Sequence, residues 1–516
     1  MAEQKKVNKW LITFAVMLPT LMEIIDTSVA NVALPHMQGS FSAGADEITW
    51  VLTSYLVSNA VVLPMTGWLG GLFGRKRFLI SCITLFTIAS FLCGAAPNLG
   101  MLIFFRVLQG AAGGALQPMS QAIMLETFPV VERGIAMAIY GVGAMFGPII
   151  GPALGGWITD NISWRWIFYI NIPTGVIAVI MAKLFVFDPS YIKKKVANID
   201  YIGLGLLVVG MGALQVVLDK GQREDWFSSP FIVIFSATAI LALIFLIYYE
   251  LHHDHPILHL RLFKDKSFAA GNFLMFMFGF CLYSTITLIA LLLQTLMGYD
   301  ATLAGMVLAP GGIATLLMMP VVGMALKKYD GRKLVFLGLI IGSVALYHMS
   351  RFTLDASFWT FVWPRVTLGV GLAMIFVPLN TLTFASIPKE EMGNATGFFN
   401  LLRNTGGGIG IGISATILQR YSQFYQNVLA THVNPYNPVF QRHFGQMKAG
   451  LIAKGIEPTA AGHKSLALLY AQVQRQAGML AYNRVFFILC IAFVSVIPFL
   501  LFLRRVKGQG PAAGMH

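Results

Sequence analysis

The feature that most constrains this chain is a series of apolar runs of about 20 residues each, separated by shorter polar connections. A helix of that length crosses the roughly 30 Å hydrocarbon core of a bilayer. Hydrophobic residues make up 57% of the chain, charged residues only 11%, and the mean hydropathy is +0.72. A soluble domain has about 25% charged residues. The runs therefore predict an all-α polytopic membrane protein.

We expect 14 transmembrane helices, arranged as two blocks of six with a pair between them. Their predicted ranges are Trp10–Leu34, Ile48–Gly70, Phe78–Ala96, Leu99–Leu125, Gly134–Trp157, Trp164–Phe187, Tyr201–Leu218, Phe231–Tyr249, Phe268–Leu292, Leu303–Leu326, Leu334–Met349, Phe358–Phe384, Gly393–Leu418 and Val485–Leu503.

A short sequence echo supports this division into blocks. Phe73-Gly74-Arg75-Lys76 follows the second span of the first block, and Asp330-Gly331-Arg332-Lys333 follows the second span of the last block. Repeats of this kind build many polytopic proteins. The prediction is a six-helix bundle at 1–187, two inserted helices with linkers at 188–267, and a second six-helix bundle at 268–516.

The net charge of +14 suggests nucleic acid as one possible partner, but the basic residues cluster in alternate short connections between spans. This is the distribution that the positive-inside rule describes, so we expect no nucleic acid and both termini in the cytoplasm. Lys5, Lys6 and Lys9 lead directly into the first span without a cleavage site for a signal peptide. We therefore expect the first span to remain in the protein.

One outer connection is much longer than the others. The segment 419–484 is polar and contains the turn-rich sequence Asn434-Pro435-Tyr436-Asn437-Pro438, followed by a helix-like stretch at Thr459–Met479. Such a length between spans is typical of a functional or a disordered segment. The sequence leaves both a docking loop and a passive insert open.

Two carboxylates lie within the first span. Glu23 and Asp26 are three residues apart and so share a helix face. Acidic side chains in hydrocarbon are costly, and desolvation and mutual repulsion both favour uptake of a proton. The pair is a candidate for proton coupling, and a structural pair hydrogen-bonded to neighbouring helices is the alternative.

Arg106 lies within the fourth span and must face the protein interior, where it needs a partner. A guanidinium near the acids of the first span would respond to their protonation. We expect either this sensing role or a static ion pair.

Further candidates are small or polar residues inside spans. The fifth span is dense in glycine and proline, which indicates close or moving helix contacts: Gly147, Pro148, Gly151, Pro152, Gly155 and Gly156. Other polar side chains are expected to line a substrate cavity or to join helices: Asn31, Gln117, Asn380, Asn400, Arg403 and Asn404.

The sequence contains no nucleotide-binding loop and no nucleophile motif, so we expect no enzyme activity and no cofactor. The four cysteines lie inside apolar runs, without metal-ligand spacing or a disulfide framework.

These segments together resemble the major facilitator superfamily, and in particular its 14-span drug:proton antiporters of EmrB/QacA type. The resemblance covers nearly the whole chain. It is carried by Ile25–Pro35, by Arg106 with Gln109 and Gly110, by the glycines and prolines of the fifth span, by Trp164–Pro173, and by the hairpin Gly67–Arg77 with Gly67, Gly74, Arg75 and Lys76.

The resemblance implies that Asp26 couples transport to protons and that the fifth-span motif belongs to an antiporter. It also implies a periplasmic membrane-fusion adaptor and an outer-membrane channel as partners of the long outer segment. The hairpin departs from the family pattern, because Gly71 stands where an Asp of a charge clamp is usual. That clamp is therefore in question.

The sequence thus predicts a proton-driven exporter of hydrophobic or amphiphilic drugs in a bacterial inner membrane, working by alternating access. An exporter of a defined metabolite, such as a siderophore, fatty acid, bile salt or amino acid, is one alternative. A symporter is a weaker one, and a non-transporting scaffold or sensor belongs to another class.

Overall fold

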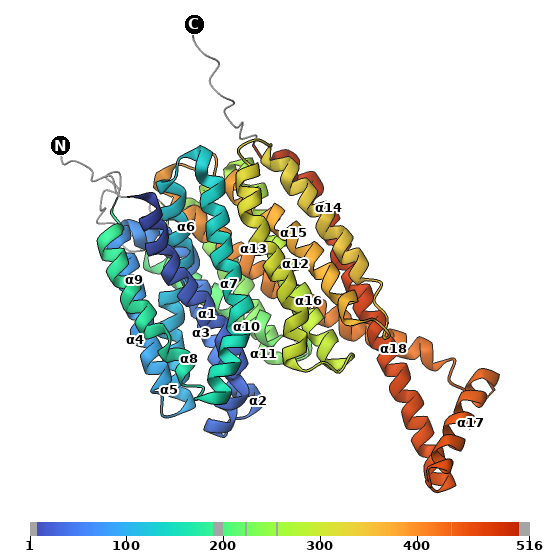
Figure 1. Ribbon diagram of the computed structural model, residues 1–516. Coiled ribbons are helices and arrows are strands. Elements are labelled where there is room, and N and C mark those ends of the chain that lie inside the picture. The colour runs from blue at the N-terminus through green and yellow to red at the C-terminus, as the bar shows by residue number, and fades with distance from the viewer. Residues whose placement is uncertain (1–7, 189–199, 222–223, 254–255, 435, 505–516) are drawn as a thin grey trace, which may run out of the picture.

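The computed structural model describes residues 8–188, 200–221, 224–253, 256–434 and 436–504, and in these ranges the regular structure is helical throughout. Both ends of the described chain lie at one end of a helical bundle, which we call the terminal end (Figure 1). The opposite end is the far end. Most helices run between the two ends, and a helical hairpin projects beyond the far end.

Residues 8–188 form the N-terminal bundle. Its helices are α1 (Lys9–Phe41), α2 (Ala45–Ile48), α3 (Trp50–Phe73), α4 (Arg75–Gly94), α5 (Leu99–Gly113), α6 (Leu116–Thr127), α7 (Arg133–Asn161), α8 (Trp166–Tyr169) and α9 (Asn171–Phe185). The predicted fourth span is divided into α5 and α6 at Gly114 and Ala115, and α6 brings its polar side chains to the second bundle.

The C-terminal bundle begins at α12. It contains α12 (Lys266–Thr295), α13 (Ala301–Ala325), α14 (Gly331–Met349), α15 (Phe358–Thr383), α16 (Met392–Ala430) and α18 (Pro458–Ser495). The inserted pair is α10 (Tyr201–Lys220) and α11 (Pro230–His252), and α10 packs against both α3 and α16.

Thirteen helical segments of the described chain are long and apolar enough to cross a membrane. The predicted thirteenth span, in α16, is not among them because Asn394, Asn400, Arg403 and Asn404 lower its hydropathy. It nevertheless packs against α12, α18 and α3 inside the bundle. The all-helical architecture of two six-helix bundles with two inserted helices agrees with the sequence prediction.

Helix starts are fixed by side-chain caps at the positions where the apolar runs begin. Asp265 accepts hydrogen bonds from the backbone N–H groups of Ser267 (2.8 Å) and Phe268 (3.0 Å). Asp300 and Asp330 cap α13 and α14 in the same way. Because an aspartate satisfies N–H groups that lack intrahelical partners, these residues set where the spans begin.

The segment 419–484 is a helical hairpin, not an irregular loop. Helix α16 continues past the membrane-length portion to Ala430, α17 spans Pro438–Ala453, and α18 runs without interruption from Pro458 into the last span. Helix α17 packs on α18 beyond the far end of the bundle (Figure 1).

Candidate functional site

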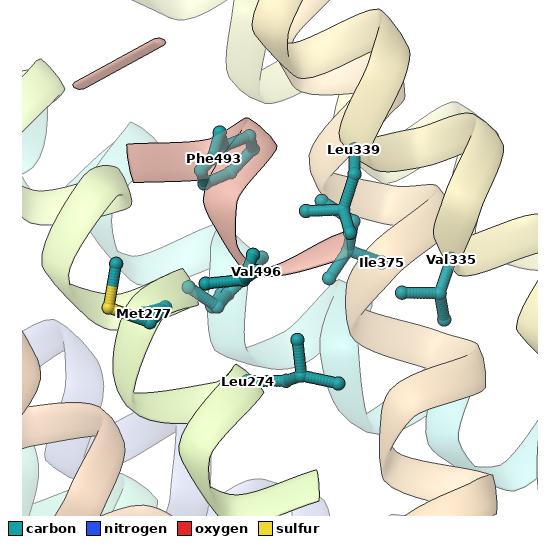
Figure 2. A pocket seen from close by; sticks show the side chains of 8 residues that line it. Leu274, Met277, Val335, Leu339, Ile375, Phe493 and Val496 are labelled. Carbon is teal, nitrogen blue, oxygen red and sulfur yellow. The ribbon is translucent and has the colours of Figure 1, made fainter. Parts of the chain in front are cut away.

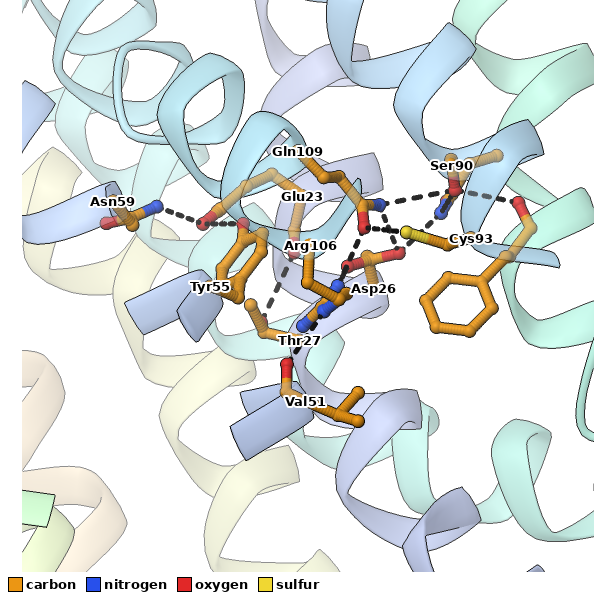
Figure 3. A network of polar contacts seen from close by, with 12 residues as sticks. Glu23, Asp26, Thr27, Val51, Tyr55, Asn59, Ser90, Cys93, Arg106 and Gln109 are labelled. Atoms are coloured by element: carbon orange, nitrogen blue, oxygen red, sulfur yellow. Dashed lines mark hydrogen bonds and ion pairs between the residues drawn. The ribbon is translucent and has the colours of Figure 1, made fainter. Parts of the chain in front are cut away.

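Asp26 lies at the centre of a buried polar network inside the N-terminal bundle (Figure 3). Its Oδ2 accepts a hydrogen bond from Arg106 Nη1 at 2.8 Å. Its Oδ1 accepts from Gln109 Nε2 at 2.9 Å and from Asn171 Nδ2 at 2.6 Å. The hydroxyl of Ser90 accepts from both amides, at 3.2 and 2.9 Å. Side chains from α5 and α9 therefore hold the carboxylate of α1 on both oxygens, and Ser90 of α4 supports the two amides.

Arg106 has no exposed surface, yet its guanidinium is well supplied with partners. Besides the ion pair, Nε donates to the carbonyl of Val51 at 3.1 Å and Nη1 donates to Gln109 Oε1 at 2.8 Å. The guanidinium carbon lies 4.2 Å from the centre of the Tyr55 ring. A buried charge needs such compensation. The expected partner is present, and the choice between a sensor and a static anchor stays a prediction.

Glu23 has a separate set of partners. Its Oε1 accepts hydrogen bonds from Tyr55 Oη at 3.1 Å and Asn59 Nδ2 at 3.4 Å, and its Oε2 accepts from Gln117 Nε2 at 2.6 Å. All three donors are neutral. Tyr55 therefore touches both clusters, because its ring lies beside Arg106 and its hydroxyl binds Glu23 (Figure 3).

The Glu23 cluster reaches the C-terminal bundle through Gln117. The amide oxygen of Gln117 accepts a hydrogen bond from Arg403 Nη2 at 2.8 Å. Arg403 also donates from Nε and Nη2 to Asn404 Oδ1, both at 3.3 Å. A continuous series of polar contacts thus runs from Asp26 in the first bundle to α16 in the second.

A second polar contact between the bundles lies one turn further along α6. Gln121 donates to Asn380 Oδ1, and its own amide oxygen accepts from Asn400 Nδ2 at 2.6 Å. Thr396 donates to the carbonyl of Pro118 at 3.0 Å. Asn380 and Asn400 are almost completely buried. Their side chains therefore join the two bundles in this structure.

Of the polar residues predicted to line a cavity, Gln117, Asn380, Asn400, Arg403 and Asn404 gather at the contact between α6 and the helices α15 and α16. Asn31 does not join them. It is exposed, and its amide donates to the carbonyl of Thr27 in its own helix at 3.0 Å. A role of any of these residues in substrate binding stays a prediction.

The glycines of α7 bring this helix against α1, which carries both acids. A Cβ at Gly147 would lie 2.2 Å from Ile24, one at Gly151 would lie 2.4 Å from Ser28, and one at Gly155 would lie 2.9 Å from Val29. Gly156 faces Val32 at 3.9 Å, an ordinary contact distance. Close packing therefore depends on three of the four predicted glycines. The side chains of Pro148 and Pro152 lie outside the described residues.

The hairpin between α3 and α4 meets the start of α16 at the terminal end. A Cβ at Gly67 would lie 2.3 Å from the backbone nitrogen of Asn394. Arg75 forms an ion pair with Glu126 of α6, and its Nη2 donates to the carbonyl of Lys389 at 3.3 Å. The hairpin thus connects the bundles through glycine packing and an arginine.

The turn itself needs glycine at position 74, where φ is +84°. Asp188 lies beside Gly74 and accepts a hydrogen bond from the backbone N–H of Lys76 at 2.8 Å. Open space surrounds the Cβ position of Gly71. Arg75 of this hairpin pairs with Glu126 of the same bundle, and the clamp that Gly71 puts in question stays untested.

A small apolar cavity lies within the C-terminal bundle (Figure 2). Its lining includes Leu274, Phe278, Leu339 and Phe493 from α12, α14 and α18. Its volume of about 10 Å³ corresponds to about one water molecule. It is too small to hold an amphiphilic substrate in this conformation.

Sequence reasoning missed several members of the polar networks: Tyr55, Asn59, Ser90, Gln121 and Glu126. Each is a polar residue within or at the end of an apolar run, which was the available signal. Only the packing of distant helices shows which polar residues meet.

Two six-helix bundles around a buried network of charged and amide side chains define a membrane transporter of the major facilitator fold. The sequence pattern of the Major Facilitator Superfamily matches residues 16–411, so the chain belongs to this family.

The chain is similar along its length to several proteins that are named for multidrug export or for resistance. It is 35% identical over 505 residues to the Multidrug export protein EmrB of Escherichia coli strain K12, covering 98% of this chain and 97% of that protein. It is also 35% identical over 488 residues to the Fatty acid resistance protein FarB of Neisseria gonorrhoeae, covering 94% of each. The Colistin resistance protein EmrB of Acinetobacter baumannii is 26% identical over 501 residues, covering 96% of this chain and 97% of that protein.

Solved structures support the fold. The human organic anion transporter MFSD10 (TETRAN) matches with a TM-score of 0.62 at 12% identity, covering 94% of this chain and 99% of that one. A double Trp mutant of XylE matches with a TM-score of 0.63 at 12% identity, covering 97% of each.

Proposed function

We propose that this protein is a proton-coupled antiporter that exports hydrophobic or amphiphilic drugs from the cytoplasm, with the proton gradient as its energy source. The full-length similarity to multidrug exporters supports the cargo class. The observation that carries proton coupling is the series of contacts from the buried Asp26 through Arg106 and Tyr55 to Glu23.

The physical argument begins with the charge of Asp26. When a proton neutralises this carboxyl, Arg106 loses its counter-charge in a site that excludes water. The guanidinium then lowers its free energy by exchanging its contacts. Tyr55 lies directly beside it, so such a change would act on Tyr55. Because Tyr55 also binds Glu23, the change reaches the second acid.

Glu23 in turn acts on the contact between the bundles. Its partner Gln117 is the residue that Arg403 of the C-terminal bundle binds. Altered protonation of either acid therefore changes the free energy of the state in which the bundles meet here. That is the requirement for alternating access, in which two bundles rock around a central site.

The state described by the structure fits the outward-facing half of such a cycle. The hydrogen bonds described between the bundles run from Arg75 at the terminal end to Arg403 in the first third of α16. Arg133 adds a 3.3 Å hydrogen bond to the carbonyl of Phe384 between them. We assign the terminal end to the cytoplasm because the basic connections lie there, and we place the protein in a bacterial inner membrane.

We assign the helical hairpin of α17 and α18 to the periplasm, as a docking site for a membrane-fusion adaptor that leads to an outer-membrane channel. Its exposed surface carries large side chains that a solvated segment does not need, including Tyr436 (93% exposed) and Val439 (63% exposed). Exposed apolar groups of this kind favour a protein partner.

The central test is Asp26→Asn in proteoliposomes with an imposed pH gradient, compared with Asp160→Asn. Asp160 lies at the far end of α7 and is exposed, so it provides the same chemical change outside the network. We expect D26N to lose proton-driven export of a lipophilic dye and D160N to retain it. Undiminished coupling in D26N would refute the assignment of Asp26.

A metabolite exporter on the same fold is the second candidate, and the similarity to the Fatty acid resistance protein FarB favours a fatty acid among such cargoes. Parallel transport of lipophilic dyes and defined metabolites separates the two. A non-transporting scaffold or sensor would tolerate neutral substitution of Asp26 and Arg106 because there would be no flux to lose.

A further inference from the structure

Arg365 is a buried cation that plays no part in the networks above. It lies in α15, seven residues and about 10 Å from the start of this helix at the far end. Only 7% of its surface is exposed. The polar residues discussed so far lie nearer the terminal end of α15, so Arg365 belongs to a different level of the bundle.

The guanidinium of Arg365 lacks a partner within the described part of the chain. Its Nε and Nη1 are inaccessible to solvent and make no hydrogen bond there. In contrast, Arg106 and Arg403 both bind several acceptors. A buried, unpaired guanidinium is strongly unfavourable, so the position calls for an anion.

The chain itself supplies no obvious anion at this level. The membrane-length segments of the C-terminal bundle contain no Asp or Glu, and the acids of that bundle lie in its connections. The two acids within α1 are already bound, Asp26 by Arg106 and Glu23 by Gln117. The missing counter-charge must therefore come from a molecule that enters the protein.

The side chain of Arg365 starts between α15 and α13, on a helix face that reaches the N-terminal bundle further along α15. Phe376 lies eleven residues, about three turns, further along α15 and so shares its face. The ring of Phe376 lies against Gly141 of α7, in the other bundle. The Cβ of Arg365 itself lies 3.3 Å from the Cβ position of Gly311 on α13, so its side chain leaves α15 beside α13, nearer the far end.

The backbone that carries Arg365 is held firmly. A Cβ at Gly311 of α13 would lie 2.7 Å from the carbonyl oxygen of Arg365, and a Cβ at Gly369 would lie 2.1 Å from the carbonyl oxygen of Gly311. The hydroxyl of Thr315 donates to both glycine carbonyls, at 2.9 and 3.0 Å. A fixed backbone presents the guanidinium without loss of chain entropy on binding.

We infer that Arg365 is the cationic half of a substrate subsite, which binds the carboxylate of an anionic amphiphile while the surrounding apolar side chains contact its tail. A guanidinium fits this group because it donates two parallel hydrogen bonds to a carboxylate. The inference rests on the proposed export function, and it adds a place for one class of cargo.

The test measures binding of three probes with the same chain length, dodecanoate, dodecanol and dodecyltrimethylammonium, to purified protein in nanodiscs. Arg365→Gln removes the charge, Arg365→Lys retains it, and Arg351→Gln is the control at an exposed arginine stacked on Tyr347. We expect R365Q to weaken dodecanoate binding by about tenfold or more. Binding of dodecanol should be unchanged in R365Q, and all three probes should bind R351Q as they bind the wild type.

R365K should retain the preference of the wild type for dodecanoate over dodecanol. Unchanged dodecanoate binding in R365Q would overturn the inference, and so would an equal loss for all three probes, which would indicate disturbed packing. If R365Q does not fold, the wild type must still bind dodecanoate more tightly than dodecanol, and equal affinities would refute the subsite. Dye export by the wild type, measured separately, tests the proposed function without reference to this site.

Discussion

The side chains of Gln117 and Arg403 meet across the two bundles, with Arg403 Nη2 donating to Gln117 Oε1 at 2.8 Å. The same amide donates to Glu23 at 2.6 Å. Gln117 therefore lies between a buried acid of the first bundle and a buried cation of the second. The protonation of the acid and the contact between bundles act on one side chain.

Replacing Gln117 with Leu should slow proton-driven export by about tenfold, because Glu23 loses a donor and Arg403 loses an acceptor. Initial rates in proteoliposomes measure the effect. Gln294→Leu is the matched control at an exposed position of α12, and its rate should equal that of the wild type. A Q117L rate equal to that of Q294L would show that the bridge is unimportant.

Replacing Arg106 with Gln should destabilise the protein by about 3–5 kcal/mol, because Asp26 remains buried without its counter-charge. Thermal unfolding in detergent is the measurement. The double variant D26N/R106Q should recover much of the loss, since neither charge is then left alone. A double variant less stable than R106Q would contradict this account of the pair.

Replacing Gly151 with Ala should impair folding or export, because the new Cβ would lie 2.4 Å from Ser28 of α1. Gly156→Ala in the same helix is the control, since its Cβ would lie 3.9 Å from Val32. Unfolding temperature and export rate are measured for both variants. Equal behaviour of G151A and G156A would mean that α1 and α7 separate more easily than their packing indicates.

The Glu391–His259 contact at the terminal end should make stability depend on pH. Burial alone would raise the pKa of Glu391, but hydrogen bonds from His259 (3.0 Å) and Asn394 (2.7 Å) lower this pKa overall. A carboxyl with a lowered folded-state pKa stabilises the protein above its ordinary pKa of about 4.3, and this stabilisation disappears as the pH falls through the folded-state pKa.

Glu391→Gln should therefore lower the unfolding temperature by roughly 1–2 °C at neutral pH, since the contact is partly exposed. The difference from the wild type should shrink below about pH 4. Glu390→Gln is the control at the exposed neighbouring residue. A difference that is constant across the pH range would exclude ionisation of Glu391 as the cause.

Combining Tyr436→Ala with Val439→Asp on the helical hairpin should weaken capture of a periplasmic adaptor by about tenfold, because both side chains are largely exposed and available to a partner. A pull-down with the purified adaptor measures how much adaptor each variant captures. Thr459→Ala, at the start of α18, is the control. Capture by the double variant at wild-type levels would argue for a passive insert.

The fold followed closely from the sequence, and the reason is physical. A bilayer imposes a minimum apolar length on every span, so each helix leaves its own local signal. Helix α16 has the weakest local signal, because its polar residues lower its mean hydropathy below that of the other spans. The sequence nevertheless predicted a span there. Within the segment 419–484 the helix-like stretch at Thr459–Met479 is confirmed as part of α18, whereas the continuation of α16 and the helix α17 were not expected, because helices beyond the membrane leave no length signal.

The sequence by itself determined a polytopic helical protein, the division into blocks, and the presence of costly charges at Glu23, Asp26 and Arg106. The tertiary structure alone decided which side chains meet: Tyr55 linking the two acids, Gln117 linking the bundles, and Arg365 left without a partner. Apolar length is a property of one segment of chain. Pairing of buried polar groups depends on side chains that lie from 32 to 286 residues apart in the sequence, and only packing brings them within hydrogen-bond distance.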